Sequence, residues 1–301
     1  MLSFWALIKR NTKVYFKDKG VFFTSLITPL ILLCLFVTFM RNVYIDSIKT
    51  AIPAELNIPN SLFEGFAGGW LISSLLAVSC ITVAFCANMI MVSDKVNGSI
   101  KDIQMTPVKS HILNLSYYVS TVFVTCIVCY TAFAIGLIYL AFVGFYLTFS
   151  SIMLAILDVF LLVMFGTALS SIVCRFLNSQ GGISAVGTLV SSVYGFICGA
   201  YMPMSQFGDT LQKVLMFLPG TYGTGLIRNH MMTDTLNKLE SYGVNEQITA
   251  ELSKSFDATM SFFGHDIGPS TMYAVLGITV VVLVGIFLLI SLPIKKKKTK
   301  N

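Results

Sequence analysis

The chain has 301 residues, of which 55% are apolar and 11% are charged, and its formal net charge is +6. A soluble domain carries about 25% charged residues, so this composition leaves too little polar surface for a water-soluble globule of this size. It excludes an ordinary soluble enzyme, a disordered protein and a fibre, and it predicts a polytopic membrane protein.

The amino-terminal segment is rich in positive charge. Residues 1–19 are expected to form an interfacial helix, with apolar side chains on one broad face and cationic side chains at its edges. The apolar members are Phe4, Trp5, Ile8, Tyr15 and Phe16, and the cations are Lys9, Arg10, Lys13 and Lys17. The alternative is a basic stretch that only sets the orientation in the membrane.

Six apolar stretches follow, and each is long enough to cross a bilayer as a helix, which takes about 20 residues. They cover residues 20–40, 67–93, 115–140, 151–174, 183–202 and 271–293. Pro29 predicts a kink in the first stretch. In the second, Gly68 and Gly69 predict a close helix approach, and Trp70 is expected to lie at the membrane interface.

The predicted fold class is therefore an all-α polytopic membrane protein, with residues 1–301 as one transmembrane domain. It has six transmembrane helices, an amino-terminal interfacial helix, a short cytoplasmic helix and amphipathic external helices before the last span. Residues 203–270 form the predicted external segment, in which the stretch 229–270 reads as amphipathic helices broken near Gly243. That stretch is expected either to cap the outer mouth of the protein or to select its substrate.

The distribution of Lys and Arg predicts the orientation. Residues 1–19, the loops 94–111 and 175–182, and the tail from Lys295 hold most of these residues. Because positive charge favours the cytoplasmic side, both termini are expected in the cytoplasm of a cell whose plasma membrane the chain crosses several times. The run Lys295–Lys298 is expected to anchor the tail at the lipid surface.

The loop of residues 94–112 has the pattern of a short helix at the membrane surface. Gly98 can end the preceding helix, and Ser99 can cap the next one. Pro107 then stops that helix. Side chains on one face are expected to meet a cytoplasmic partner, namely those of Ile100, Ile103 and Gln104. From the residues alone, the loop can also be a simple connector.

Two sets of residues resemble the permeases of type-2 ABC exporters, the class that includes the daunorubicin-resistance permeases. The first set matches the family's loop between the second and third spans in order and spacing: Asp94, Gly98, Ser99, Thr106, Pro107 and Val108. The family often has Glu where this chain has Asp94. The second set matches the family's segment after the fifth span, with its amphipathic helices and Leu-Pro turn: Gly199, Pro203, Phe207, Leu211, Phe217, Leu218, Pro219, Tyr222 and Arg228.

The resemblance implies a permease subunit with no catalytic residue and no cofactor of its own. The sequence has no G-x-x-x-x-G-K-[ST] motif, so ATP and Mg are expected on a separate ATP-binding-cassette ATPase. That subunit would bind the 94–112 loop and the amino-terminal helix. Coupling is expected to involve Asp94, Gly98, Ser99, Ile100, Asp102, Ile103, Thr106 and Pro107. Two permeases, either two copies or a copy and a homologue, would enclose the substrate path.

The expected function is export of a hydrophobic or amphipathic compound, such as a drug, an antibiotic, a peptide or a lipid-like metabolite. Alternatives are export of a lipid-linked glycan or an ion by a similar permease, and an ATP-independent channel or secondary transporter. An intramembrane hydrolase is excluded because no G-x-S-x-G motif and no His occur in a predicted span. The lipid membrane is an expected partner, and nucleic acid is not.

Asp158 is the acidic residue inside a predicted span. A charged acid at mid-membrane costs roughly 2.5–3.5 kcal/mol, so Asp158 is expected to face a polar cavity on the substrate path or to bond to Ser, Thr or Tyr of another helix. The seven cysteines all lie in apolar stretches, and His111, His230 and His265 lie in separate segments. Neither a disulfide framework nor a metal site is expected.

Overall fold

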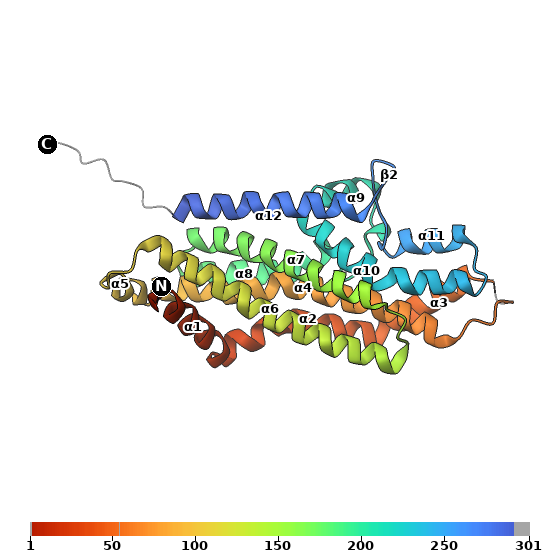
Figure 1. Cartoon of the computed structure of the whole chain (residues 1–301), viewed down its shortest axis with the longest axis horizontal. Coiled ribbons are helices and arrows are strands. Elements are labelled where there is room, and N and C mark those ends of the chain that lie inside the picture. The colour runs from red at the N-terminus through yellow and green to blue at the C-terminus, as the bar shows by residue number, and fades with distance from the viewer. Residues whose placement is uncertain (1, 54, 292–301) are drawn as a thin grey trace.

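The computed structural model describes residues 2–53 and 55–291, so the predicted lipid anchor at Lys295–Lys298 lies outside the described residues. The helices form an elongated bundle (Figure 1). They are α1 (Leu2–Lys17), α2 (Lys19–Leu35), the π-helix η1 (Phe36–Met40), α3 (Arg41–Ala51), α4 (Asn60–Val96), α5 (Ser99–Gln104), α6 (Ser110–Val143), α7 (Phe149–Phe176), α8 (Gln180–Ile197), the 3-10 helix η2 (Met204–Gln206), α9 (Asp209–Met216), α10 (Pro219–Ser241), α11 (Glu246–Ser255) and α12 (Pro269–Ser291).

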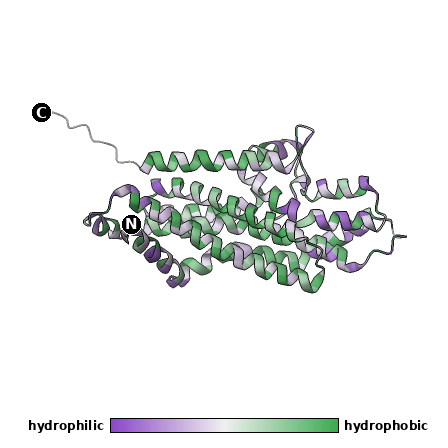
Figure 2. Ribbon diagram, in the orientation of Figure 1, coloured by the Kyte–Doolittle hydropathy of each residue, from purple (hydrophilic) through white to green (hydrophobic). Residues whose placement is uncertain are grey.

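The two ends of the bundle are distinct. α1 and α5 lie at one end, which we call the α5 end, and α3 and α11 lie at the other, which we call the α11 end (Figure 1). Hydrophobic residues fill the length between the ends, and hydrophilic residues gather at both (Figure 2). This distribution is the one expected of helices that cross a bilayer.

The all-α polytopic membrane fold is confirmed, although within the described residues five helices, and not six, are long and apolar enough to be spans. The five are Lys19–Ala51, Asn60–Val96, Ser110–Val143, Phe149–Phe176 and Pro269–Ser291. The remaining predicted span, residues 183–202, corresponds to the shorter apolar stretch Gly181–Ile197 of α8. α8 stops at Ile197 because Gly199 adopts a positive φ of 67°, which turns the backbone out of the helix.

α4 is the central helix, and α2, α6, α7, α8 and α10 pack around it. In its apolar window 89% of the residues are buried, a higher share than in the other four spans. The predicted close approach is present at Gly69, where an added Cβ would lie 2.7 Å from the Met231 carbonyl oxygen of α10. Small residues on α4 therefore let its neighbours pack backbone against backbone.

The first span is longer than its apolar stretch predicts. α2, η1 and α3 run without a break from Lys19 to Ala51, so α3 extends the helix beyond the predicted end at residue 40. Arg41 Nε donates to Glu64 Oε2 at 2.9 Å, which ties α3 to α4. The ion pair gives Arg41 a protein partner in addition to any interfacial role.

Part of the predicted external segment 203–270 packs into the bundle, which the sequence did not predict. α10 lies within this segment, yet its first turns are buried against α4, α7 and α12. Pro219 occupies the first turn of α10, where its missing N–H leaves no bond unmade. Apolar stretches did not reveal this packing because α10 mixes small and polar residues with its apolar ones.

The rest of the segment contains a helix and a hairpin. The predicted break near Gly243 is confirmed, since α10 ends at Ser241 and α11 begins at Glu246. The strands β1 (Met260–Phe262) and β2 (His265–Ile267) then pair antiparallel, an element that the sequence did not predict. Phe263 and Gly264 form the turn, both with positive φ, as a two-residue hairpin connection requires.

Candidate functional site

Two apolar cavities lie along the side of the bundle formed by α2 and α8. The first, of about 720 Å³, opens between these helices, which both pack on α4, and its floor is formed by Cys86 and Met89 of α4. The second, of about 650 Å³, lies towards the α11 end, between η1, α3, α11 and the turn that follows α8. Cavities of this volume suit a drug-sized molecule.

Tyr201 lines both cavities and so marks where they meet. Its ring packs edge-on against Phe196 of α8, with the ring centroids 4.9 Å apart. Hydroxyl groups of Thr24, Thr28 and Ser192 face the first cavity, and their neighbours there are largely aliphatic. Among the described residues, no Lys or Arg lines either cavity, and Asp18 is the charged residue in the first.

A fully buried arginine holds the walls of the second cavity together. Arg228 of α10 donates from Nη1 to Asp257 Oδ2 at 2.9 Å and from Nη2 to Ser74 Oγ of α4 at 2.9 Å. Its Nη2 also donates to the Gly199 carbonyl oxygen at 2.7 Å, in the turn after α8. One side chain thus joins α4, α10, the post-α8 turn and the segment after α11.

Asp257 completes this cluster from the opposite side. Its carboxylate accepts hydrogen bonds from the backbone N–H groups of Met204 and Ser205, at 2.6 Å and 3.2 Å. Asp257 has a φ of 55°, an uncommon value for a residue other than glycine. Burial raises the pKa of the Asp257 carboxyl and lowers the pKa of the Arg228 guanidinium, and the attraction between the two opposes both shifts.

Aromatic rings surround the ion pair. The Arg228 guanidinium lies over the Trp70 ring, 5.1 Å from its centroid. Tyr44 contacts Trp70 and Phe256 edge-on, at centroid distances of 4.8 Å and 5.3 Å. Trp70 is not exposed to lipid as an interfacial anchor would be: its side chain is fully buried and stacks on the arginine.

Of the residues after α8 that resemble the exporter family, Gly199 contacts Arg228, whereas Leu211, Phe217 and Leu218 are exposed. Gly199 supplies a carbonyl acceptor, and Pro203 lines the second cavity. Leu218 and Pro219 begin α10, and Tyr222 is buried one turn later. Asp257 was missed by the sequence because it lies 29 residues beyond its partner, in a segment with no motif.

At the α5 end, Asp94 is buried and belongs to the interior. Arg10 of α1 makes a two-point ion pair with the Asp94 carboxylate, in which Nη2 lies 2.9 Å from Oδ1. The Tyr117 hydroxyl of α6 donates to Asp94 Oδ2 at 2.6 Å. The hydrogen bonds to Asp94 raise the pKa of Arg10. Asp94 thus joins α1, α4 and α6, and its carboxylate has little surface to offer a partner.

The next residue connects α4 to a further helix. Lys95 Nζ donates to the backbone carbonyl oxygens of Cys174, Arg175 and Leu177, at 3.1 Å, 2.8 Å and 3.2 Å. Carbonyls at the carboxyl end of a helix have no partner within it and carry partial negative charge, so the lysine caps α7. This role of Lys95 was not predicted, because a lysine in a short loop is common.

α5 presents a different face from the predicted one. Ile100 and Ile103 pack against the bundle instead of facing a partner. The exposed side chains are those of Lys101, Asp102, Gln104, Met105, Thr106 and Pro107, and Met105 is 86% exposed. The apolar face of so short a helix is needed to hold it on the bundle, which leaves the opposite face and the turn that follows for a partner.

The start of α5 also differs from the prediction. Gly98 is its N-cap and has a φ of 81°, and no side chain makes a capping hydrogen bond there. The predicted capping role of Ser99 is therefore wrong, because Ser99 is already the first helical residue. Gly98 does end the preceding helix as expected, since α4 stops at Val96.

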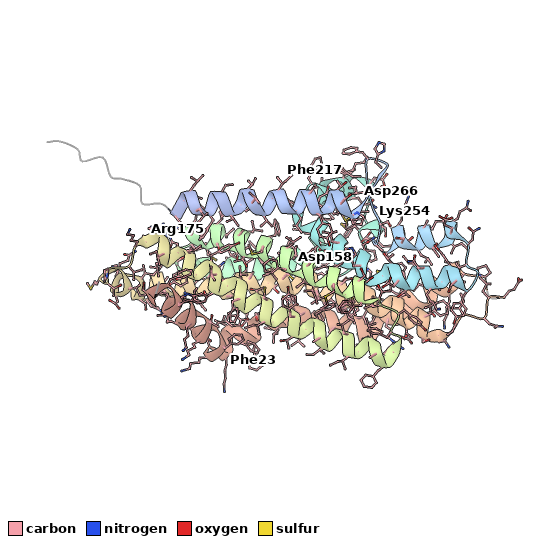
Figure 3. The ribbon with its side chains drawn as sticks, in the orientation of Figure 1. Phe23, Asp158, Arg175, Phe217, Lys254 and Asp266 are labelled. Carbon is pink, nitrogen blue, oxygen red and sulfur yellow. The ribbon has the colours of Figure 1, made fainter. Side chains whose placement is uncertain are left out.

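Asp158 lies inside the bundle, away from both cavities (Figure 3). Its Oδ2 is 2.6 Å from His230 Nδ1 of α10, and its Oδ1 accepts the hydroxyl proton of Tyr273 of α12. Of the two predicted roles, the structure displays the interhelical hydrogen bond, with a histidine as an additional partner. The contact between Asp158 and His230 was not predicted, because the two residues lie 72 positions apart in the sequence.

The described residues contain no group of three or more His, Cys, Asp or Glu that could hold a metal ion. All seven cysteines lie within the described residues and are unpaired. Five of the cysteine side chains are buried among apolar neighbours, where they act as small packing groups.

Two comparisons with known proteins bear on this architecture. A family model described as ABC-2 type transporter matches residues 2–232, from α1 into α10. The match includes the whole first cavity, the second cavity except for its wall from Leu252, Ser255 and Phe256, and also Asp94, α5 and Arg228. No curated protein matches the chain.

Proposed function

The chain belongs to the ABC-2 type transporter family, and on that premise we propose that it exports a hydrophobic or amphipathic compound, driven by a separate ATP-binding-cassette ATPase. As a member of this family it is a membrane-spanning transporter permease. The direction, the substrate class and the ATPase partner are the proposal. The observation that carries it is the pair of apolar cavities that meet at Tyr201 and lead along the bundle.

The lining of the cavities favours one class of substrate. Aliphatic, thioether and aromatic side chains predominate, and scattered hydroxyl groups can bind polar atoms. A lipid-linked glycan carries phosphate groups, which proteins usually bind with Arg, Lys or clustered backbone amides. Because no cation among the described residues lines the cavities, a neutral or cationic amphipathic compound fits better than a lipid-linked glycan. Asp18 lies where a cationic group would enter from the α5 end.

We assign the α5 end to the cytoplasm, since α1 and the α4–α6 connection carry much of the positive charge. Both termini then lie in the cytoplasm, and α5 faces the expected ATPase. The exposed residues Asp102 and Met105 are its contact points. Ile100 and Ile103 position the helix and do not touch the partner.

Hydrogen bonds and an ion pair at the carboxyl end of α4 connect this helix to its neighbours, so that they can transmit a movement of α5. Movement of α5 reaches α4 directly, since two residues separate the helices. Asp94 passes that movement to α1 and α6, and Lys95 passes it to α7. α4 is also the floor of the first cavity, so its displacement changes the width of the space between α2 and α8. A second permease would close the open side of the cavities.

Co-purification in mild detergent tests the partner. The parent chain is expected to bring with it an ATP-binding protein in stoichiometric amount, with ATPase activity. Met105→Asp should abolish the association, because it places a charge on the exposed contact face. Lys49→Asp, at the α11 end, is the control and should leave the association intact. Phe23→Asp is not used, because the exposed Phe23 side chain on α2 is expected to face lipid. A pure permease without ATPase activity in several detergents would refute the motor-driven proposal.

A further inference from the structure

The segment between α10 and α12, together with α9, carries apolar side chains that the described part of the chain leaves uncovered. Phe217, next to the end of α9, is 68% exposed, and Phe263, at the tip of the β1–β2 hairpin, is 61% exposed. Leu211, Val214 and Leu218 add further exposed apolar surface on and beside α9. We call these five residues the hairpin surface. An exposed apolar surface of this kind indicates a contact with an apolar partner.

The place of the hairpin surface along the bundle identifies that partner. β2 ends at Ile267, and α12 begins at Pro269. With 23 residues at about 1.5 Å each, α12 is about as long as the hydrocarbon core of a bilayer is thick. Its first turn therefore lies at the membrane boundary, and the hairpin is fixed within a few residues of that boundary.

The direction of the hairpin is the second observation. It turns across the long axis of the bundle, at the level where α12 begins, instead of extending along that axis into water (Figure 1). α9, whose end carries Phe217, lies at a similar level (Figure 3). A hairpin that points sideways at this height reaches the interfacial layer of the adjacent leaflet, where aromatic side chains are favoured.

The charged side chains near the hairpin are placed as expected at a membrane–water interface. Lys213 Nζ lies 5.8 Å from the centroid of the Phe263 ring, so a cation stands beside the aromatic tip, where lipid phosphates would be. On the side towards α11, Lys254 and Asp266 form an exposed ion pair at 2.9 Å. These two residues lie together at the α11 end (Figure 3). The tip of the hairpin is thus apolar, and Asp266, in the middle of β2, is paired with Lys254 of α11.

We propose that the hairpin surface is a membrane contact, in which Phe263 and Phe217 enter the interfacial layer of the leaflet at the α11 end. The segment after α10 is then held at two points. Asp257 binds it to the protein through Arg228, and Phe263 binds it to lipid a few residues later. The proposal depends on neither the substrate nor the ATPase.

Tryptophan fluorescence in proteoliposomes tests the contact. Phe263→Trp is reconstituted into phosphatidylcholine and into phosphatidylcholine brominated on its acyl chains, and the spectrum of the parent, which has Trp5 and Trp70, is subtracted. Val281→Trp, on the exposed side of α12, is the lipid control, and Tyr242→Trp, in the turn after α10, is the water control. Brominated lipid is expected to quench the Phe263→Trp variant strongly, as it quenches the Val281→Trp variant, and to leave the emission of the Tyr242→Trp variant nearly unchanged.

Two results would overturn the proposal. Emission of the Phe263→Trp reporter at long wavelength without quenching would place the tip in water. Emission at short wavelength without quenching would place it against protein, such as a second copy of the chain. Phe217→Trp is a second reporter for the same surface. It tests the membrane contact even if the Phe263→Trp variant does not reconstitute. Absence of quenching at both positions would rule out the membrane contact.

Discussion

Arg228 and Asp257 form an ion pair that connects the stretch matching the family model to the segment that follows it. The guanidinium is fully buried, and the two side chains meet at 2.9 Å between Nη1 and Oδ2. Arg228 lies within the stretch that matches the ABC-2 family model, and Asp257 lies beyond it. The pair fixes the post-α8 turn and α11, which are both walls of the second cavity.

Loss of this ion pair is expected to destabilise the protein strongly. Removal of one partner of a buried pair costs about 3–5 kcal/mol, since the other charge is left without compensation. Asp257→Ala should therefore lower the thermal unfolding temperature in detergent. Asp266→Ala is the matched control, because its exposed pair with Lys254 contributes only about 0.2–1 kcal/mol. Equal shifts for the two variants would contradict the role given to Arg228 and Asp257.

Asp94 is expected to transmit movement without binding the ATPase. Asp94→Asn keeps the shape of the side chain and removes the charge that pairs with Arg10. We expect this variant to retain the ATPase subunit on co-purification and to lose ATP-driven transport, whereas Met105→Asp should lose the subunit itself. If Asp94→Asn also released the subunit, Asp94 would belong to the contact surface, in keeping with the coupling role that the family resemblance implies.

Lys95 is expected to transmit movement as well, from α4 to α7. Lys95→Met removes three hydrogen bonds from a charged donor, a type of bond worth about 1.5–3 kcal/mol in stability. The release of the α7 terminus should weaken the coupling between ATP hydrolysis and transport. Lys95→Arg can still reach the carbonyls and should restore part of it. The measurement is the number of substrate molecules moved per ATP hydrolysed, and an unchanged ratio in Lys95→Met would exclude the cap from coupling.

Asp158 is expected to support the bundle and not the substrate path. Asp158→Asn weakens the bonds to His230 and Tyr273 and should lower the unfolding temperature. Transport of neutral and of cationic compounds should fall together, if it falls at all. A selective loss of cationic substrates would show instead that Asp158 meets the substrate. Tyr273→Phe, which removes one of the same bonds, is the control for a purely structural effect.

Some of this architecture followed from the sequence, and the reasons are physical. Long apolar stretches located α2, α4, α6, α7 and α12, because lipid demands continuous apolar surface. The reversal between α6 and α7 and the break at Gly243 were also visible. The burial of α10 was not predicted, since a helix that packs on protein through small residues needs no continuous apolar stretch.

The contacts of the candidate site were harder to predict from the sequence than the helices of the fold. The spacing of Ile100 and Ile103 identified a helix with an apolar face, but spacing is the same whether that face meets a partner or the bundle. The motif drew attention to Asp94 and Arg228, while their bonds depend on Arg10 and Asp257, which are distant in sequence. No local pattern marks such long-range pairs, and only the folded chain reveals them.

The central claim is that the chain provides the path for a compound moved by ATP, and one measurement tests it most directly. The permease and its ATPase are reconstituted into vesicles, and ATP-dependent movement of a neutral and of a cationic amphipathic dye is recorded. Thr24→Trp fills the first cavity, while Phe23→Trp changes the adjacent residue on α2, whose side chain lies outside that cavity (Figure 3). We predict that the Thr24 variant stops dye movement and that the Phe23 variant does not. Equal movement in the parent and both variants, or movement that needs no ATP, would contradict the account.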